Sequence, residues 1–313
     1  MVAYVVRRLF STIVVMAVVA FVVFSLLYLT PGDPAAVIAG DIATDEDIRR
    51  IHARLGLDEP FLVQFGRWLW ALLHGDLGTS IFTNLPVTTL IGQRVEPTIA
   101  LTVCTLVVAI AVAVPLGVVA AAKAGTWIDR AVMAFSVLGF SVPVFVVAYG
   151  LILTLSVELD WLPVQGYRNF RDGVWQWFRH LILPSIALGT VYVALIARMT
   201  RAAMLEVLSQ DYIRTAQAKG LSNTRVLLAH ALKNASVPIV TTIGLGFALL
   251  ISGAIVTETV FSIPGIGRLT VDAILQRDYP LIQGIVLVFS ASYVLLNLLV
   301  DISYTFLDPR IRY

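Results

Sequence analysis

Long apolar runs separated by short polar segments dominate this chain. A membrane-spanning helix needs about 20 mostly apolar residues. Six runs without Asp, Glu, Lys or Arg meet or approach that length, and they cover residues 9–29, 98–122, 131–157, 181–197, 237–257 and 281–300. The fourth run is short, but Met199, Ala202 and Leu205 keep a helical apolar spacing, so its helix is expected to continue past Arg198. The pattern predicts an all-α integral membrane protein with six transmembrane helices.

Composition agrees with this class. Only 13% of the 313 residues are charged and 58% are hydrophobic, whereas soluble domains carry about 25% charged residues. The net charge of +2 gives no indication of nucleic-acid binding. The single cysteine, Cys104, excludes an internal disulfide and is expected to pack as a small apolar side chain. The first run exceeds the 7–15 apolar residues of a signal-peptide core, so we expect an uncleaved first span rather than a cleaved leader.

The distribution of Lys and Arg predicts the orientation. An even number of spans places both termini on one side of the membrane, and basic residues concentrate in cytoplasmic segments. With the termini inside, the inner segments hold 12 of the 22 basic residues, including Lys123, Lys219 and Lys233, although together they are only about half as long as the outer loops. Both termini and the segment around residue 216 are therefore expected in the cytoplasm.

The first outer loop, residues 30–97, is expected to contain two helices. Thr44 followed by Asp47 is typical of a helix N-cap with an acidic first turn, and Gly56 suits the end of that helix. After Pro60, an apolar face that includes Trp68 predicts a second helix at the membrane interface. Two interpretations stay open: a lid that packs on the bundle, or a landing site for an external partner.

A polar, helix-forming segment follows the fourth span. Residues 205–219 are expected to form a helix that ends at Gly220, and Ser222 suits the N-cap of a second helix. Ala216 is small and would let another protein approach closely, with Asp211, Arg214 and Lys219 as a polar rim. The alternative is an ordinary loop whose basic residues contact anionic lipid.

This segment also resembles a known family. The run Arg214-Thr215-Ala216, then Gly220, then His230-Ala231-Leu232 is similar to the EAA loop of binding-protein-dependent ABC importer permeases, although Arg-Thr replaces Glu-Ala and Lys233 stands where proline is common. Further segments in the expected order resemble the B-type permease subunit of dipeptide and oligopeptide importers, a group that includes nickel and glutathione transporters. They are LTPGDPA from residue 29, RLGLDEP from 54, GDLGTS from 75, ETVFSIPGIGRL from 258, RDYPLIQG from 277 and LDPRIRY from 307.

The resemblance implies a type I ABC importer permease fold, with residues 1–97 as an N-terminal span and outer loop and 98–313 as the permease core. It implies a bacterial cytoplasmic membrane protein whose partners are a second homologous permease subunit, two cytoplasmic ATP-binding subunits and an extracytoplasmic substrate-binding protein. The partner ATPases would bind ATP and Mg²⁺, and this chain no cofactor. The implied ATPase-coupling loop comprises Asp211, Tyr212, Arg214, Thr215, Ala216, Ala218, Lys219 and Gly220.

Acidic residues at the ends of two predicted spans are further candidates for a structural or functional role. Glu258, Pro264 and Gly265 at the outer end of the fifth span would shape an outer gate or anchor the turn at the headgroups. Asp301 near the inner end of the sixth span is expected to pair with Arg198 or Arg201.

Enzymatic motifs are missing from the sequence. It contains no G-x-x-x-x-G-K-[ST], H-E-x-x-H or G-x-S-x-G, and its histidines, His52, His74, His180 and His230, are scattered singly. We therefore expect a translocation subunit rather than an enzyme. A stand-alone secondary transporter remains the alternative class, although the spans lack the ionisable residues typical of such proteins. Dipeptides are the first expected substrate, followed by oligopeptides, with glutathione and nickel open.

Overall fold

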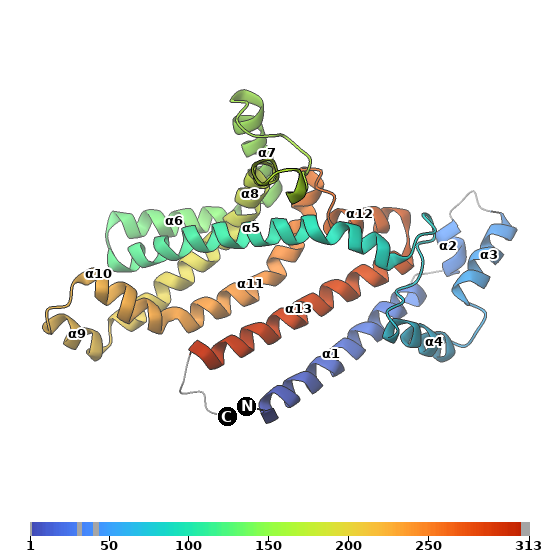
Figure 1. The fold of residues 1–313 in the computed structure, drawn as a ribbon, viewed down its shortest axis with the longest axis horizontal. Helices are drawn as coiled ribbons and strands as arrows, with labels where there is room; N and C mark the ends of the chain where they lie inside the picture. Colours follow the sequence, from blue (N-terminus) through green and yellow to red (C-terminus); the bar gives the residue numbers. More distant parts are fainter. Residues whose placement is uncertain (1, 30–32, 40–43, 308–313) are drawn as a thin grey trace. The chain divides into compact units, whose positions relative to one another are not determined.

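The computed structural model describes residues 2–29, 33–39 and 44–307, which are almost entirely helical (Figure 1). The α-helices are α1 (Val2–Leu29), α2 (Pro34–Ala39), α3 (Asp45–Leu55), α4 (Phe61–Leu73), α5 (Val87–Ala122), α6 (Trp127–Ser141), α7 (Val144–Leu151), α8 (Val174–Leu208), α9 (Asp211–Ala218), α10 (Asn223–Arg225), α11 (Leu232–Val260), α12 (Ile266–Gln276) and α13 (Tyr279–Leu307). Two π-helical segments, η1 (Ile152–Glu158) and η3 (Val226–Ala231), and a 3-10 turn, η2 (Phe170–Asp172), complete the described elements.

The described residues contain five helices that are long and apolar enough to cross a membrane, and a sixth if one bent pair counts as a span. The five lie within α1, α5, α8, the segment from Asn223, and α13. These match five of the predicted spans, and the expected extension of the fourth beyond Arg198 is confirmed because α8 continues to Leu208.

The third predicted span is not one straight helix. Its two parts, α6 and α7 with η1, meet at an angle of 102°. Val142 adopts an extended conformation and Pro143 begins the next helix, because proline has no N–H to donate and disfavours a helical residue before it. The predicted span over residues 131–157 is therefore broken into two helices at this proline.

The chain forms two compact units, residues 1–95 with 269–295, and residues 96–268 with 296–313. In the first unit, α1 packs on α4 through aromatic rings: the Phe24 centroid lies 5.4 Å from that of Phe65 and 5.3 Å from that of Trp68. Ala20 and Val23 of α1 are also buried against Leu287 of α13. The division between residues 97 and 98 stays a prediction.

Both helices expected in the first outer loop are present. Thr44 caps α3 in a complete capping box with Asp47, and Gly56 ends the helix with a left-handed φ of 66°. On α4, Phe65 and Trp68 face α1, whereas Leu62 and Leu73 are exposed. One face of α4 thus packs on the first span, as the lid interpretation expects, and the other is open.

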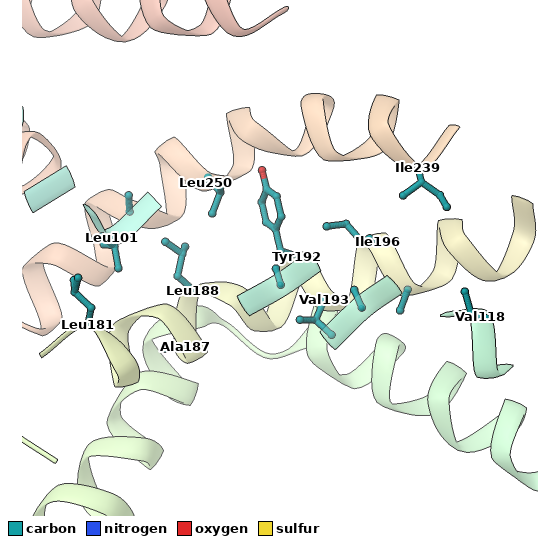
Figure 2. Close-up of a cluster of buried hydrophobic side chains, with 14 of the residues drawn as sticks. Leu101, Val118, Leu181, Ala187, Leu188, Tyr192, Val193, Ile196, Ile239 and Leu250 are labelled. Atoms are coloured by element: carbon teal, nitrogen blue, oxygen red, sulfur yellow. The ribbon is translucent and has the colours of Figure 1, made fainter. Parts of the chain in front are cut away.

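Helix α8 is the centre of the second unit, where α5, α6, α7 and α11 pack around it. Figure 2 shows the Tyr192 ring pointing from α8 toward α11, among Leu188, Ile196 and Leu250. Glycines lie at several crossings, since a Cβ added to Gly117 would overlap Thr200 and one added to Gly246 would overlap Tyr192. Small residues let helices in a membrane approach closely.

Candidate functional site

The polar segment after α8 forms a helical hairpin, residues 209–234, which we call the coupling hairpin. It begins where α8 ends at Leu208, because the Ser209 hydroxyl donates to the Glu206 carbonyl at 2.7 Å and Gln210 then becomes extended. Asp211 opens the separate short helix α9, where its charge favours the helix N-terminus. The expectation of one continuous helix over residues 205–219 is therefore wrong, and the break lies at the cap-forming sequence Ser-Gln-Asp.

Gly220 makes the turn of the hairpin, as predicted. Its φ of +80° lies in the left-handed region, and its N–H donates to the Gln217 carbonyl at 2.9 Å. Ser222 occupies the predicted N-cap position, and its carbonyl accepts from Val226 at 3.0 Å. Its side chain, however, makes no capping hydrogen bond.

The chain returns through the π-helical segment η3 before α11 begins. Single π-turns within helices are uncommon and frequently mark functional sites. Val226 and Ala231 of η3 are buried, as are Ile213 and Ala216 of α9, and the two segments pack together. Ala216 is therefore covered by this chain itself, with 9% of its surface exposed, and does not open a close approach for another protein.

The outer face of α9 carries the remaining residues of the predicted coupling loop. All of them are exposed: Asp211, Tyr212, Arg214, Thr215, Ala218, Lys219 and Gly220. Arg214 lies 3.7 Å from Asp211, an exposed pair that contributes little to stability. The Asn234 amide donates to the Tyr212 hydroxyl at 3.0 Å and to the His230 carbonyl at 2.7 Å, which ties α9 to the start of α11. The hairpin thus combines a packed inner face with a polar, mostly basic outer face.

The second predicted group lies at the corner between α11 and α12. Glu258 is fully buried; its carboxylate accepts from the Thr98 hydroxyl at 2.6 Å and from the Arg268 backbone N–H at 3.0 Å. The Thr98 hydroxyl in turn accepts from the N–H of Ile266 at 2.8 Å. Glu258 therefore stabilises the N-terminus of α12 from inside the protein.

Glycine at position 265 makes room for this carboxylate. A Cβ added to Gly265 would overlap the Glu258 carboxylate, and one added to Gly267 would overlap the backbone of Ile255. Pro264, between the buried Ile263 and Gly265, is only partly buried. Of the two interpretations, this burial favours an anchor for the turn, placed within the protein rather than at lipid headgroups.

Comparison with known families decides the wider identity. Residues 113–313 match the family described as binding-protein-dependent transport system inner membrane component, and residues 1–102 match the N-terminal region of the same kind of protein. This chain belongs to that family. As a member, it has the type I ABC importer permease fold and is an inner-membrane permease subunit.

Relatives that match along the full length of the chain are also described as transport permeases. The chain is 55% identical over 310 residues to a probable peptide ABC transporter permease, y4tP, of Sinorhizobium fredii, with 99% of each protein covered. It is 44% identical to the dipeptide transport system permease DppB of Alkalihalophilus pseudofirmus and to the glutathione transport system permease GsiC of Salmonella paratyphi A, with both chains fully covered.

The permease also contains a buried ion pair that the sequence analysis missed. Arg201 of α8 donates to both oxygens of Asp129 at the start of α6, at 2.5 and 2.8 Å, and the Gly125 N–H donates to the same carboxylate at 2.9 Å. This pair fixes the turn between α5 and α6 to α8. Asp301, which the sequence analysis expected to pair with Arg198 or Arg201, has a side chain outside the described residues. The sequence feature that marks Asp129 is an acidic residue in the first turn of a helix that is otherwise mostly apolar.

No metal centre is found in the part of the permease that the structure describes: no three His, Cys, Asp or Glu residues gather there in a way that would hold an ion.

Proposed function

We propose that this permease subunit imports short peptides, and that the coupling hairpin receives the movement of separate ATP-hydrolysing subunits. The relatives named above carry the words peptide, dipeptide and glutathione, and glutathione is itself a small peptide. The complete machine would comprise this chain, a second homologous permease, two cytoplasmic ATPases that bind ATP and Mg²⁺, and an extracytoplasmic binding protein. Both termini would lie in the cytoplasm, as the distribution of basic residues predicts.

The observation that carries the coupling role is the two-sided construction of the hairpin. Ile213 and Ala216 pack against Val226 and Ala231, so α9 and η3 move together. The exposed side chains of Tyr212, Arg214, Thr215 and Lys219 remain available to a partner. Because α8 enters the hairpin and α11 leaves it, a push on α9 would be delivered to the two most closely packed helices of the second unit.

The test is uptake of a labelled dipeptide by vesicles that contain the full complex. Gly220→Pro removes the left-handed turn, and Ala216→Leu separates α9 from η3. Both should reduce uptake strongly while the chain stays in the membrane. Gly75→Ala is the control, because Gly75 has a similar φ of +82° in the first unit and open space around it.

Two results would contradict this function. Normal uptake and normal co-purification of the ATPases in both hairpin variants would exclude the coupling role. Uptake by the purified single chain with an ion gradient and no ATPase would indicate a secondary transporter instead.

A further inference from the structure

The first unit contains a half-open cavity of about 340 Å³. Helices α1 and α4 form one side, and the loop after α4 together with the start of α13 forms the other. Small-molecule sites in proteins have volumes of about 300–1,000 Å³. The cavity is therefore at the small end of that range, suited to a ligand much smaller than a phospholipid.

Internal contacts hold the α1–α4 side of the cavity. Gln64 of α4 is 8% exposed; its Nε2 donates to the Glu59 carbonyl at 2.6 Å, and its Oε1 accepts from the Tyr28 hydroxyl. The Trp68 ring packs on Phe24, with centroids 5.3 Å apart. These contacts within the chain hold the wall in place, and a preformed wall lowers the cost of binding.

A buried carboxylate holds the opposite side. Asp278, 1% exposed, accepts from the Ser80 hydroxyl at 2.5 Å and from the Ile81 N–H at 3.3 Å. This bond connects the loop after α4 with the residue before α13, and it joins two of the sequence motifs noted above, GDLGTS and RDYPLIQG. Gly78 and Pro280, which flank the connection, both line the cavity.

The chemistry of the walls indicates the class of ligand. Phe24, Leu27 and Trp68 give an apolar surface, and Arg67 is the one formally charged side chain among the described residues that line the cavity. One guanidinium nitrogen of Arg67 donates to Glu59 at 2.8 Å. A guanidinium has five N–H donors, so it also has the capacity to bind a second carboxylate.

We propose that this cavity binds a short peptide, with the peptide's C-terminal carboxylate on Arg67 and an apolar side chain against Phe24, Leu27 and Trp68. The inference rests on the proposed function, because peptide transport is what brings such a ligand to this permease. It adds a substrate-holding site on the N-terminal unit, formed by α1, α4 and the start of α13.

The first test needs no mutation. The full chain is placed in phosphatidylcholine nanodiscs without ATPases or binding protein, and binding of alanyl-leucine and of its C-terminal amide is measured by titration calorimetry. The acid should bind about 10-fold or more tightly than the amide, because the amide lacks the charge that Arg67 recognises. Equal binding of the two compounds, or no binding of either, would overturn the proposal.

The second test locates the site. Arg67→Gln should lower the affinity for alanyl-leucine by about 10-fold or more, to that of the amide, and Arg67→Lys should lower it less because the charge remains. Arg171→Gln, an exposed arginine of η2 in the other unit, is the matched control and should have no effect. Selective binding of the acid that Arg67→Gln leaves unchanged would place the site elsewhere and refute the inference.

A third test distinguishes a peptide site from a lipid site. The unmodified chain is placed in nanodiscs that contain phosphatidylglycerol. If it retains that lipid in an Arg67-dependent way and binds no dipeptide, the cavity is a lipid site and the inference is wrong. Uptake by the full complex distinguishes the two proposals. If uptake is normal and depends on the hairpin, but no dipeptide binds at Arg67, only the cavity site is refuted. Normal uptake by the hairpin variants refutes the coupling role, whatever the calorimetry shows.

Discussion

The side-chain amide of Asn234 donates a hydrogen bond to the phenolic oxygen of Tyr212 across 3.0 Å. Residue 234 belongs to the start of α11 and residue 212 to the first turn of α9, so this bond closes the hairpin at its base. Since Ile213, the next residue, is buried, α9 is fixed both by packing and by a polar contact.

Removal of this bond should loosen α9. Tyr212→Phe keeps the ring and deletes the acceptor, and we expect a loss of about 0.5–1.5 kcal/mol in the local stability of α9. Hydrogen exchange of the α9 amides measures it, and the same variant should lower ATP-driven uptake. Tyr149→Phe, an exposed tyrosine of α7, is the control. Unchanged α9 exchange in Tyr212→Phe would show that packing alone holds the helix.

The Asp129–Arg201 pair should be important for stability. Asp129→Asn or Arg201→Gln leaves the other charge unpaired in a mostly buried place, which costs about 3 kcal/mol. Thermal unfolding in detergent should show a loss of stability in each single variant. The loss of stability in the double variant should be much less than the sum of the two single losses. Arg130→Gln changes an exposed neighbour and should have little effect. Additive losses would show that the two side chains act independently.

The Glu258 corner should not accept a side chain at residue 265. Gly265→Ala places a methyl group where the Glu258 carboxylate lies, so we expect a destabilisation of about 1–3 kcal/mol and a displaced α12. Gly150→Ala is the matched control, since a Cβ there meets nothing within 4 Å. Equal melting temperatures for the two variants would contradict the proposed role of the carboxylate.

The cap of α3 should depend on pH. Hydrogen bonds from the Thr44 hydroxyl and the Thr44 N–H lower the pKa of Asp47 below its usual 3.8. A lowered pKa in the folded state means that the carboxylate stabilises α3 above pH 3.8 and that this contribution disappears as the pH falls below it. Amide exchange in α3 should increase on acidification in that range. Thr44→Val removes the hydroxyl donor but keeps the backbone N–H, so it should weaken this dependence, and an identical pH profile in the variant would contradict the role of the hydroxyl.

Features fixed by neighbouring residues were predicted from the sequence. The Thr44 cap, the left-handed Gly56 and Gly220, and the extension of α8 depend on residues within a few positions of each other. The sequence also contained the cause of the bend at Pro143, but periodicity alone does not tell a kinked span from a broken one.

Features fixed by distant partners were not predicted. Ala216 faces inward because η3 returns beside α9, and the sequence of α9 alone does not show which of its faces is covered. The sequence indicates Asp301 as the acid that would pair with Arg198 or Arg201, and only the three-dimensional arrangement shows that Arg201 binds Asp129, 72 residues away. The cavity beside Arg67 likewise requires four separate segments to come together.

The Glu258 corner has a consequence for biogenesis. Thr98 leaves the ribosome 160 residues before Glu258, and chains acquire structure from the N-terminus during synthesis. The carboxylate therefore finds its hydroxyl partner only if the second hydrophobic segment has already entered the bilayer and stayed within reach of the translocon. A chain in which that earlier insertion fails would bury the Glu258 carboxylate without its Thr98 partner.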